Sequence, residues 1–340
     1  MSEPPRDLLA ALTRLGLLPA GEIAPAEALA GGVSSDIWRV DLPDGPVCVK
    51  RALAKLKVEA DWQVPVERSG YEIAWMETVA GIDPGIVPRL LASDAESGLF
   101  VMPYLDPADY PVWKDRLMDG QADPAFAESV GQAVVRIHAA TAGNELMAMR
   151  FDSGEIFHAI RLDPYLLAAA RRHPDRADAI RPVVATTAET RLALVHGDVS
   201  PKNILIGPTG PVFLDAECAW YGDPAFDLAF CLNHLLLKCV HRPPAAPGYL
   251  ACFDALANAY MAGVDWEPPK ALENRVARLL PGLMLARVDG KSPLEYLDTE
   301  AQQDAVRRTA RTLLAAPVDT LAALRARWAE DLALGEGKPR

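Results

Sequence analysis

A carboxylate and a carboxamide stand five residues apart in the segment His196-Gly197-Asp198-Val199-Ser200-Pro201-Lys202-Asn203. Phosphoryl transfer to an alcohol needs a carboxylate beside the attacking hydroxyl, and oxygen ligands that hold Mg²⁺ against the phosphates of the donor. A loop that curls from Asp198 to Asn203 supplies both, with the Asp198 carboxylate at the hydroxyl and the Asn203 amide oxygen at the metal. The alternative is an aspartate that caps a helix and an asparagine in a turn, which are both common.

A second metal carboxylate is predicted at Asp215, 17 residues after Asp198 and directly after the apolar run Val212-Phe213-Leu214. A hairpin over residues 204–214 would return Asp215 to the side of the loop that carries Asp198. Glu217 follows two residues later and is a candidate for an additional metal ligand.

The N-terminal third contains a lysine that could contact the phosphates of the donor. Lys50 ends the apolar strand pattern Val47-Cys48-Val49-Lys50, where kinases place the lysine that contacts the phosphates. Glu72, on the helix predicted over 66–80, is the natural partner to orient Lys50. Glu67 and Glu77 are competing partners.

A glycine-containing loop, Gly31-Gly32-Val33-Ser34-Ser35, lies between two predicted strands. Exposed backbone N–H groups there could cover phosphates, so Gly32, Ser34 and Ser35 are candidate nucleotide-binding residues. The loop lacks the G-x-G-x-x-G spacing, and a plain hairpin is the alternative interpretation. The order along the chain (glycine loop, strand lysine, helix glutamate, Asp-Asn loop, Asp-x-Glu) favours a kinase more than any single feature does.

The elements that position these residues indicate an α+β fold with two lobes. Strand patterns over 28–30, 37–42, 47–50 and 98–102 follow a short helix over 6–18, and Asp44-Gly45 is a strong turn signal. Beyond Pro103 the pattern turns helical, with helices expected at 123–141, 153–172, 176–191, 225–241, 249–262, 268–286, 300–315 and 318–333. We therefore expect an N-terminal nucleotide-binding lobe over 1–103 and a catalytic and acceptor-binding lobe over 104–340, with a ligand cleft between them.

The bulk composition limits the possible partners. Half of the 340 residues are apolar, which is enough for a sizeable core, and the net charge of −12 disfavours binding to nucleic acid or anionic membranes. The five cysteines show no C-x-x-C spacing, so we expect neither a disulfide framework nor a zinc site. No signal peptide or membrane span is recognisable, and we expect a soluble, cytoplasmic protein.

On these motifs the chain resembles the aminoglycoside phosphotransferase/choline kinase superfamily over residues 28–297. Gly197 stands where protein kinases carry arginine. The segments that run from Val49 to Ala74 and from Asp215 to Asp227 look most like methylthioribose kinases. In those enzymes proline usually separates the Asp and the Glu, where this chain has Ala216. They also carry a paired arginine on a late helix, where this chain has Arg278-Leu279.

The resemblance implies a protein-kinase-like fold and a role for each matching residue. Asp198 would be the catalytic base, and Mg²⁺ would be bound by Asn203, Asp215 and Glu217. Lys50, oriented by Glu72, would contact the α- and β-phosphates of ATP or GTP. Residues 101–105, including Met102 and Tyr104, would form the hinge that meets the base. Asp227 and His196 would hold the catalytic loop in place.

The sequence offers fewer indications of which residues bind the acceptor. Lys202 could neutralise the transferring phosphate, or be an exposed loop lysine. Trp220 and Tyr221 could shape the acceptor pocket, or pack in the core. Arg278 and Arg287 could contact the acceptor. The alternative is that they are ordinary surface residues, since basic side chains near the C-terminal end of a helix interact favourably with the helix dipole. The acidic net charge could favour a cationic acceptor, such as an aminoglycoside or a choline-like amine.

These patterns predict a kinase that phosphorylates a hydroxyl of a small metabolite or antibiotic. One alternative is a catalytically silent, nucleotide-binding regulatory protein of the same fold. A protein kinase is the other, but Asp215 is followed within about ten residues by Phe226-Asp227, which leaves little room for a peptide-binding activation segment.

Overall fold

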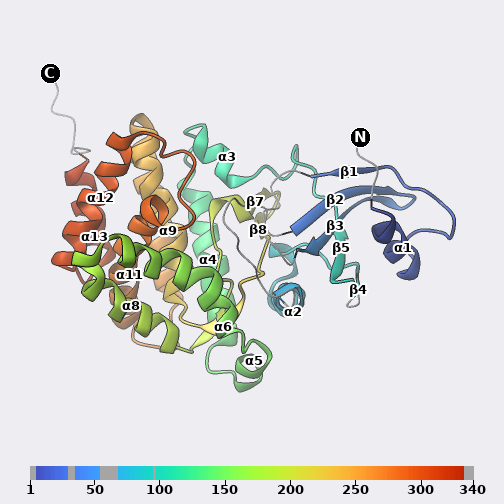
Figure 1. The fold of residues 1–340 in the computed structure, drawn as a ribbon, viewed down its shortest axis with the longest axis horizontal. Coiled ribbons are helices and arrows are strands. Elements are labelled where there is room, and N and C mark those ends of the chain that lie inside the picture. The colour runs from blue at the N-terminus through green and yellow to red at the C-terminus, as the bar shows by residue number, and fades with distance from the viewer. Residues whose placement is uncertain (1–4, 30–34, 54–67, 95–96, 333–340) are drawn as a thin grey trace.

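The computed structural model describes residues 5–29, 35–53, 68–94 and 97–332. An antiparallel sheet and two helices form its N-terminal end, and the remainder is largely helical (Figure 1). Three residues singled out from the sequence, Gly32, Ser34 and Glu67, lie outside the described residues.

The sheet has five strands in the order β1-β2-β3-β5-β4. Its strands are β1 (Ala26–Ala28), β2 (Ser35–Leu42), β3 (Gly45–Ala52), β4 (Ala92–Asp94) and β5 (Leu99–Pro103). The predicted Asp44-Gly45 turn joins β2 to β3, and Gly45 has a φ of +120°, which glycine adopts without strain. The register places Lys50 of β3 between Ile37 of β2 and Phe100 of β5.

The two faces of the sheet have different partners because successive side chains of a strand point to opposite sides. Val47 and Val49 of β3 belong to a small core with Leu8 and Leu12 of α1 (Arg6–Arg14). Lys50 points to the other face, where α2 (Arg68–Ile82) packs. The alternation in β3 therefore turns the lysine away from the small core and toward the rest of the molecule.

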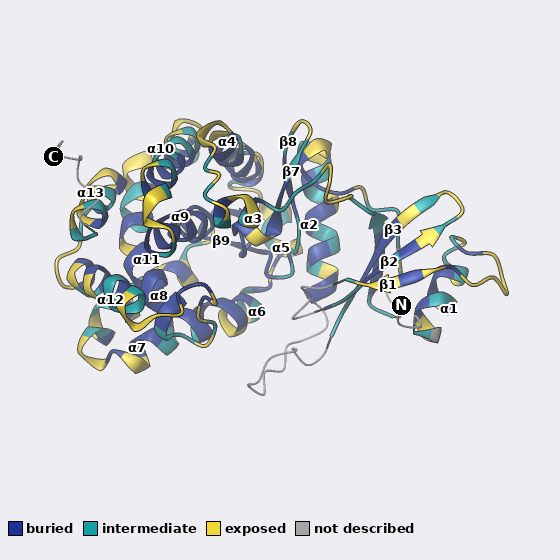
Figure 2. Cartoon of the chain, turned by 90° about the horizontal axis from the view of Figure 1, so that it is seen from above, coloured by how far each residue is buried: buried dark blue, intermediate teal, exposed yellow. Residues whose placement is uncertain are grey.

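The helical part surrounds one fully buried helix, α9 (Ala225–His241). All its residues from Ala225 to Val240 are buried, including the polar side chains of Asp227, Asn233, His234 and Lys238 (Figure 2). The other helices of this part are α3 (Trp113–Met118), α4 (Pro124–Thr141), α5 (Glu145–Arg150), α6 (Gly154–Phe157), α7 (Ala168–Arg172), α8 (Ala177–Glu189), α10 (Ala246–Ala262), α11 (Pro269–Asp289), α12 (Glu300–Ala315) and α13 (Leu321–Asp331). Short 3₁₀ turns occur at Pro84–Ile86, Pro174–Arg176, Pro201–Asn203 and Pro243–Ala245.

Each helix predicted from the sequence corresponds to helical structure, and the segment 153–172 departs from the expected geometry. Between α6 and α7 the chain forms a π-helix, His158–Leu167, with Pro164 inside it. A π-helix has wider turns than an α-helix and is frequent at functional sites. The short helices α3 and α5 and the strands β4 and β9 are not predicted from the sequence. They are three to six residues long, too short for a periodic pattern to be recognised.

Two small two-stranded sheets flank the motif residues. β7 (Ile204–Gly207) pairs with β8 (Gly210–Phe213), which confirms the predicted hairpin, and β6 (Ala193–Val195) pairs with β9 (Trp220–Gly222). Trp75 of α2 contacts the ring of Phe213 edge-on, at a centroid distance of 6.4 Å. The hairpin thus lies between α2 and the helical part (Figure 2). In the described part of the chain, no helix is long and apolar enough to cross a membrane.

Candidate active site

Asp227 of the buried helix α9 binds the backbone of the loop over residues 196–203. Asp227 Oδ2 accepts a hydrogen bond from the His196 N–H at 2.7 Å, and Oδ1 accepts one from the Gly197 N–H at 2.8 Å. The His196 ring bridges the Asp198 N–H at 3.1 Å and the Leu214 carbonyl, also at 3.1 Å. Burial lowers the pKa of His196, despite the nearby carboxylate of Asp227, so the ring is neutral and acts as a spacer. Asp227 and His196 thus have the loop-holding contacts that the resemblance implies.

Gly197 is required where it stands. Its φ is +79°, in the left-handed region, and a Cβ there would lie 2.6 Å from the Cys218 carbonyl oxygen. The loop therefore presses directly on the segment that follows Asp215, and the glycine allows this approach.

Asp198 is buried and ionised. Its Oδ2 lies 2.8 Å from Arg161 Nη2 and 3.2 Å from Lys202 Nζ. Burial raises the pKa of Asp198, but the charges of Lys202 and Arg161 outweigh it, so the pKa lies below its usual value. A carboxylate that stays ionised can accept a hydrogen bond from a substrate hydroxyl.

Arg161, on the π-helix, is a site residue that sequence reasoning missed. Its Nε donates to the Gly197 carbonyl at 2.7 Å and its Nη1 to the Ile160 carbonyl at 2.8 Å. It therefore fixes both the backbone and the carboxylate of the loop. The only signal in the sequence is an arginine between two apolar residues, Ile160 and Leu162, in a helical segment.

Asn203 and Asp215 are brought side by side. The Asn203 side-chain Nδ2 donates to the Asp198 carbonyl at 3.1 Å, and its backbone carbonyl accepts the Leu214 N–H at 2.9 Å. Asp215 follows with a φ of +67°, the only positive φ of a non-glycine residue in the part that the structure describes. Such a conformation costs energy and recurs at functional sites.

These residues fit a magnesium ion. With Nδ2 of Asn203 engaged, its Oδ1 remains as a neutral oxygen donor, and Asp215 directly follows Leu214, whose N–H binds the Asn203 carbonyl. Mg²⁺ is usually bound by one or two carboxylates together with phosphates and water. Glu217 accepts a hydrogen bond from Arg68 Nε at 2.9 Å, so its carboxylate already has a partner. Among the described residues, no three His, Cys, Asp or Glu side chains gather as a metal site.

Lys50 lies between two carboxylates. Its Nζ is 2.7 Å from Glu72 Oε1 and 2.5 Å from Asp215 Oδ1. Burial opposes the charge of Lys50, but Asp215 and Glu72 raise its pKa above the ordinary value. Of the glutamates considered from the sequence, Glu72 is in contact with Lys50 and Glu77 pairs with Arg150 at the surface, while Glu67 lies outside the described residues.

The remaining nucleotide-site candidates lie along the sheet. Ser35 begins β2 and is buried. Met102 of β5 is half-buried and pairs with Cys48 of β3. The Tyr104 N–H donates to the Pro46 carbonyl at 3.1 Å, and its ring lies under the Arg39 guanidinium.

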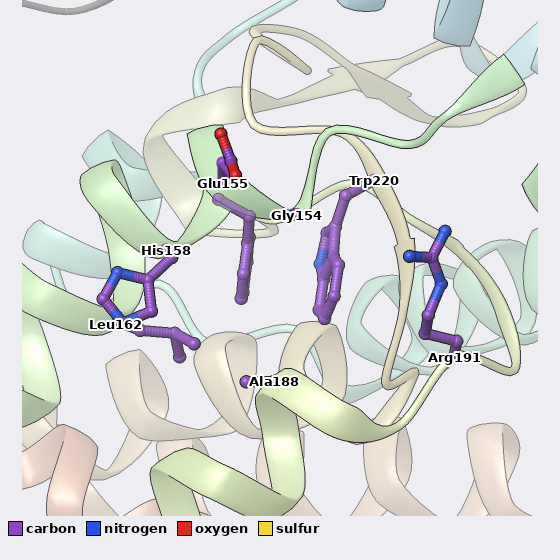
Figure 3. A pocket seen from close by; sticks show the side chains of 8 residues that line it. Gly154, Glu155, His158, Leu162, Ala188, Arg191 and Trp220 are labelled. Carbon is purple, nitrogen blue, oxygen red and sulfur yellow. The ribbon is translucent and has the colours of Figure 1, made fainter. Parts of the chain in front are cut away.

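Two of the acceptor candidates, Trp220 and Tyr221, make contacts that are typical of residues packed in a core. Trp220 stacks on Phe157 with ring centroids 4.3 Å apart. It also lines a pocket of about 450 Å³, with Arg191 near it and with His158 and Leu162 on the opposite side (Figure 3). The Tyr221 hydroxyl donates to the Leu192 carbonyl at 2.8 Å and accepts from the Asn144 N–H at 3.1 Å.

The two arginines of α11 lie in different environments. Arg278 is exposed and pairs with Asp319, so the structure does not bring it to the 196–203 loop. Arg287 is buried, and its Nη1 lies 3.2 Å from the Tyr165 hydroxyl. Lys202 reaches Asp198 and remains half exposed.

A sequence profile of the phosphotransferase enzyme family matches residues 25–238, which include Lys50, the 196–203 loop and Asp215. The chain belongs to this family. Methylthioribose kinase 1 from Oryza sativa subsp. japonica is 25% identical over 225 residues, which are 57% of this chain and 51% of that protein. Methylthioribose kinase from Geobacillus sp. (strain WCH70) is 23% identical over 258 residues, which are 68% of this chain and 64% of that protein. The chain thus spans about half to two thirds of the length of these relatives, and the expected likeness to methylthioribose kinases is confirmed.

Solved structures share the fold along nearly the whole chain. An aminoglycoside phosphotransferase from Alicyclobacillus acidocaldarius is 15% identical, with a TM-score of 0.52, over 97% of this chain and 98% of that one. A choline/ethanolamine kinase family protein from Mesorhizobium loti is 20% identical, with a TM-score of 0.50, over 96% of this chain and 94% of that one. The expected α+β, protein-kinase-like fold is confirmed.

Proposed function

We propose that this protein is a small-molecule kinase that transfers the γ-phosphoryl group of ATP or GTP to a hydroxyl of a small metabolite or antibiotic. The observation that carries the proposal is the position of Asp198. It is a buried, ionised carboxylate on a loop that also supplies Asn203, and Asp215 stands beside that loop. Asp198 accepts the hydroxyl proton as the oxygen attacks the γ-phosphorus, and the nucleoside diphosphate leaves.

Asn203 and Asp215 would hold Mg²⁺, with Glu217 as a further candidate. The ion, when bound, would neutralise charge on the donor phosphates. Lys50, oriented by Glu72, contacts the α- and β-phosphates. In this proposal, the loop that contains Gly32, Ser34 and Ser35 would cover the phosphates, and Met102 and Tyr104 would contact the nucleobase.

Lys202 and Arg161 have separate tasks in this proposal. Arg161 is fixed by two backbone carbonyls and keeps Asp198 in place. The half-exposed Lys202 is free to turn from Asp198 to the transferring phosphate.

We assign residues 1–103 to nucleotide binding and residues 104–340 to catalysis and acceptor binding, in a cytoplasmic protein that binds neither nucleic acid nor membranes. All five cysteines are free and buried, which suits a reducing compartment. The acidic net charge supports the exclusion of polyanionic partners.

The test is a coupled nucleotide-turnover assay with Mg²⁺ and either ATP or GTP, run against pools of thio-sugars, pentoses, hydroxy acids, sugar phosphates, amino alcohols, aminoglycosides and macrolides. We expect one pool to stimulate turnover. Asp198→Asn should lower kcat by about 10²- to 10⁴-fold, the usual contribution of a positioned base, and leave nucleotide affinity unchanged. Asp152→Asn removes an exposed carboxylate and is the matched control.

Two outcomes would count against the proposal. Near-normal kcat in the Asp198→Asn protein would refute the base assignment. Nucleotide binding without a phosphorylated product from any pool would support the silent regulatory protein instead.

A further inference from the structure

The buried helix α9 carries two basic side chains on one face. His234 and Lys238 are four residues apart, one helical turn, and their exposed fractions are 6% and 1%. Among the described residues, Lys238 has no carboxylate within ion-pair distance. Its Nζ lies 3.6 Å from Met118 Sδ and 4.3 Å from the centre of the Tyr296 ring.

His234 and Arg287 also have unused polar atoms. Neither ring nitrogen of His234 has a hydrogen-bond partner within the described part of the chain, and the ring rests edge-on against Phe230 at 5.5 Å. Arg287 of α11 donates through Nη1 to the Ser292 carbonyl at 2.6 Å, while its Nε is buried and unpartnered. Buried polar groups in native proteins normally have partners, so the Arg287 Nε atom indicates a missing one.

This basic cluster, which we define as His234, Lys238 and Arg287, is connected to Asp198 through Arg161. The Arg161 guanidinium, in contact with Asp198, lies over the rings of Tyr165 at 5.7 Å and Phe230 at 6.0 Å. Tyr165 in turn contacts Arg287, and Phe230 contacts His234. The cluster therefore stands behind the same side chains that hold the candidate base.

The surrounding charges do not compensate the cluster. Burial, together with the positive charge of Lys114, lowers the pKa of Lys238 to about 7. Burial also lowers the pKa of His234, as do the charges of Arg287 and Lys238. Two exposed carboxylates oppose the shift of the Lys238 pKa from a distance without an ion pair to Lys238: Glu295, which is paired with Lys114, and Asp115. An uncompensated buried cation is costly, and an anionic ligand would remove that cost.

We propose that His234, Lys238 and Arg287 bind an anionic group, a carboxylate or a phosphate, on the alcohol that Asp198 activates. The inference rests on the proposed function, because it places the acceptor beside Asp198. It reverses the expectation drawn from the net charge. The side chains that contact Asp198 are basic, namely Arg161 and Lys202, and the cluster adds three more basic groups connected to Arg161. Choline-like amines and aminoglycosides are then unsuitable, and hydroxy acids or sugar phosphates are favoured.

The first experiment measures binding by titration calorimetry on the full chain. The probes are glycerate for the carboxylate, ribose 5-phosphate for the phosphate, ribose as a neutral sugar and choline as a cation. We expect one anion to bind at least tenfold more tightly than ribose and choline, and which anion binds identifies the group. Lys238→Met should weaken this binding at least tenfold, whereas Lys270→Met, an exposed lysine of α11, should leave it unchanged.

A second variant guards against a fold defect. His234→Asn keeps a polar side chain of smaller size, and its melting temperature should stay close to that of the wild type while anion affinity falls. The proposal is overturned if neither anion binds more tightly than ribose, if choline binds best, or if Lys238→Met and His234→Asn both keep wild-type anion affinity.

Kinetics separate the two proposals. In Lys238→Met the KM of the anionic acceptor should rise at least tenfold while the KM of ATP stays within twofold. If Asp198→Asn is fully active but the anion affinity still depends on Lys238, the catalytic proposal fails and the anion site stands. If Asp198→Asn is inactive but a neutral or cationic acceptor is used equally well by wild type and Lys238→Met, the anion site fails and the kinase stands.

Discussion

Lys50 of β3 forms an ion pair with Asp215, 165 residues later in the chain, with Nζ and Oδ1 2.5 Å apart. The contact joins the five-stranded sheet to the loop that follows the β7–β8 hairpin. Because Glu72 of α2 binds the same ammonium at 2.7 Å, one lysine ties together the sheet, α2 and the candidate metal residue.

Glu72→Gln removes the charge that orients Lys50 and leaves a neutral amide in its place. A charge-assisted hydrogen bond contributes about 1.5–3 kcal/mol, so kcat/KM for ATP is expected to fall roughly 10- to 100-fold. Glu77→Gln on the same helix is the control, since Glu77 pairs with Arg150 at the surface. Equal losses in steady-state kinetics for both variants would show that Glu72 has no special role.

Arg161→Lys keeps the charge but cannot bind the Gly197 carbonyl and Asp198 together, because an ammonium lacks the planar fork of a guanidinium. We expect the free energy of unfolding to fall by about 1–3 kcal/mol, from a buried carbonyl left without its donor, and kcat to fall at least tenfold. Urea denaturation and initial rates measure the two effects. Arg171→Lys, at an exposed pair with Asp163, should change neither. An Arg161→Lys protein with wild-type kcat would remove Arg161 from the site.

Gly197→Ala should be more damaging than an alanine at another left-handed glycine. Gly16 has a similar φ of +72°, but a Cβ there meets nothing within 4 Å, whereas at Gly197 it would collide with the Cys218 carbonyl. The left-handed conformation alone costs about 1–2 kcal/mol, and we expect Gly197→Ala to lose clearly more than that and to lower kcat as Asp198 shifts. Similar unfolding free energies for the two variants would indicate that the loop can move away from residue 218.

The stability of the protein should depend on pH through Lys238. Its pKa is about 7 in the folded state and near 10.5 as the ordinary value, so the unfolded chain binds more protons between these limits. Stability therefore rises with pH in this window. Relative to Lys238→Met, the unfolding free energy of the wild type should increase by about 2 kcal/mol from pH 7 to pH 9, at up to 1.36 kcal/mol per pH unit.

Chemical denaturation of both proteins at several pH values measures this difference. Lys270→Met serves as the control for a lysine that is exposed in the fold. A difference between wild type and Lys238→Met that does not vary with pH would mean that Lys238 is charged at its ordinary pKa.

Local spacing was sufficient to predict much of the candidate site. Asp198 and Asn203 share one loop, and the hairpin that returns Asp215 is short, so their proximity follows from a few turns of chain. Lys50 was found because a strand alternates its side chains, and a strand ending in lysine can present it on the face opposite its valines. The pairing with Glu72 needed the structure, since Glu72 and Glu77 lie on the same helix and periodicity does not say which faces the sheet.

The candidates for acceptor binding depend on packing, which the sequence does not show. Net charge averages over the whole chain, whereas a ligand meets the few groups that packing gathers. The sequence pointed to Arg278 and Arg287 without distinguishing them. The packing of α11 leaves the first exposed beside Asp319 and buries the second against Tyr165.

The sequence by itself determined the order of the motifs, the α+β architecture and the loop that carries Asp198, because these depend on residues close together along the chain. Only the tertiary structure shows that Arg161 binds Asp198 and that Arg68 pairs with Glu217. It also buries His234, Lys238 and Arg287 close to the side chains that contact Arg161. Those contacts join elements far apart in the chain, and Arg161 lies on a π-helix that no sequence pattern predicts.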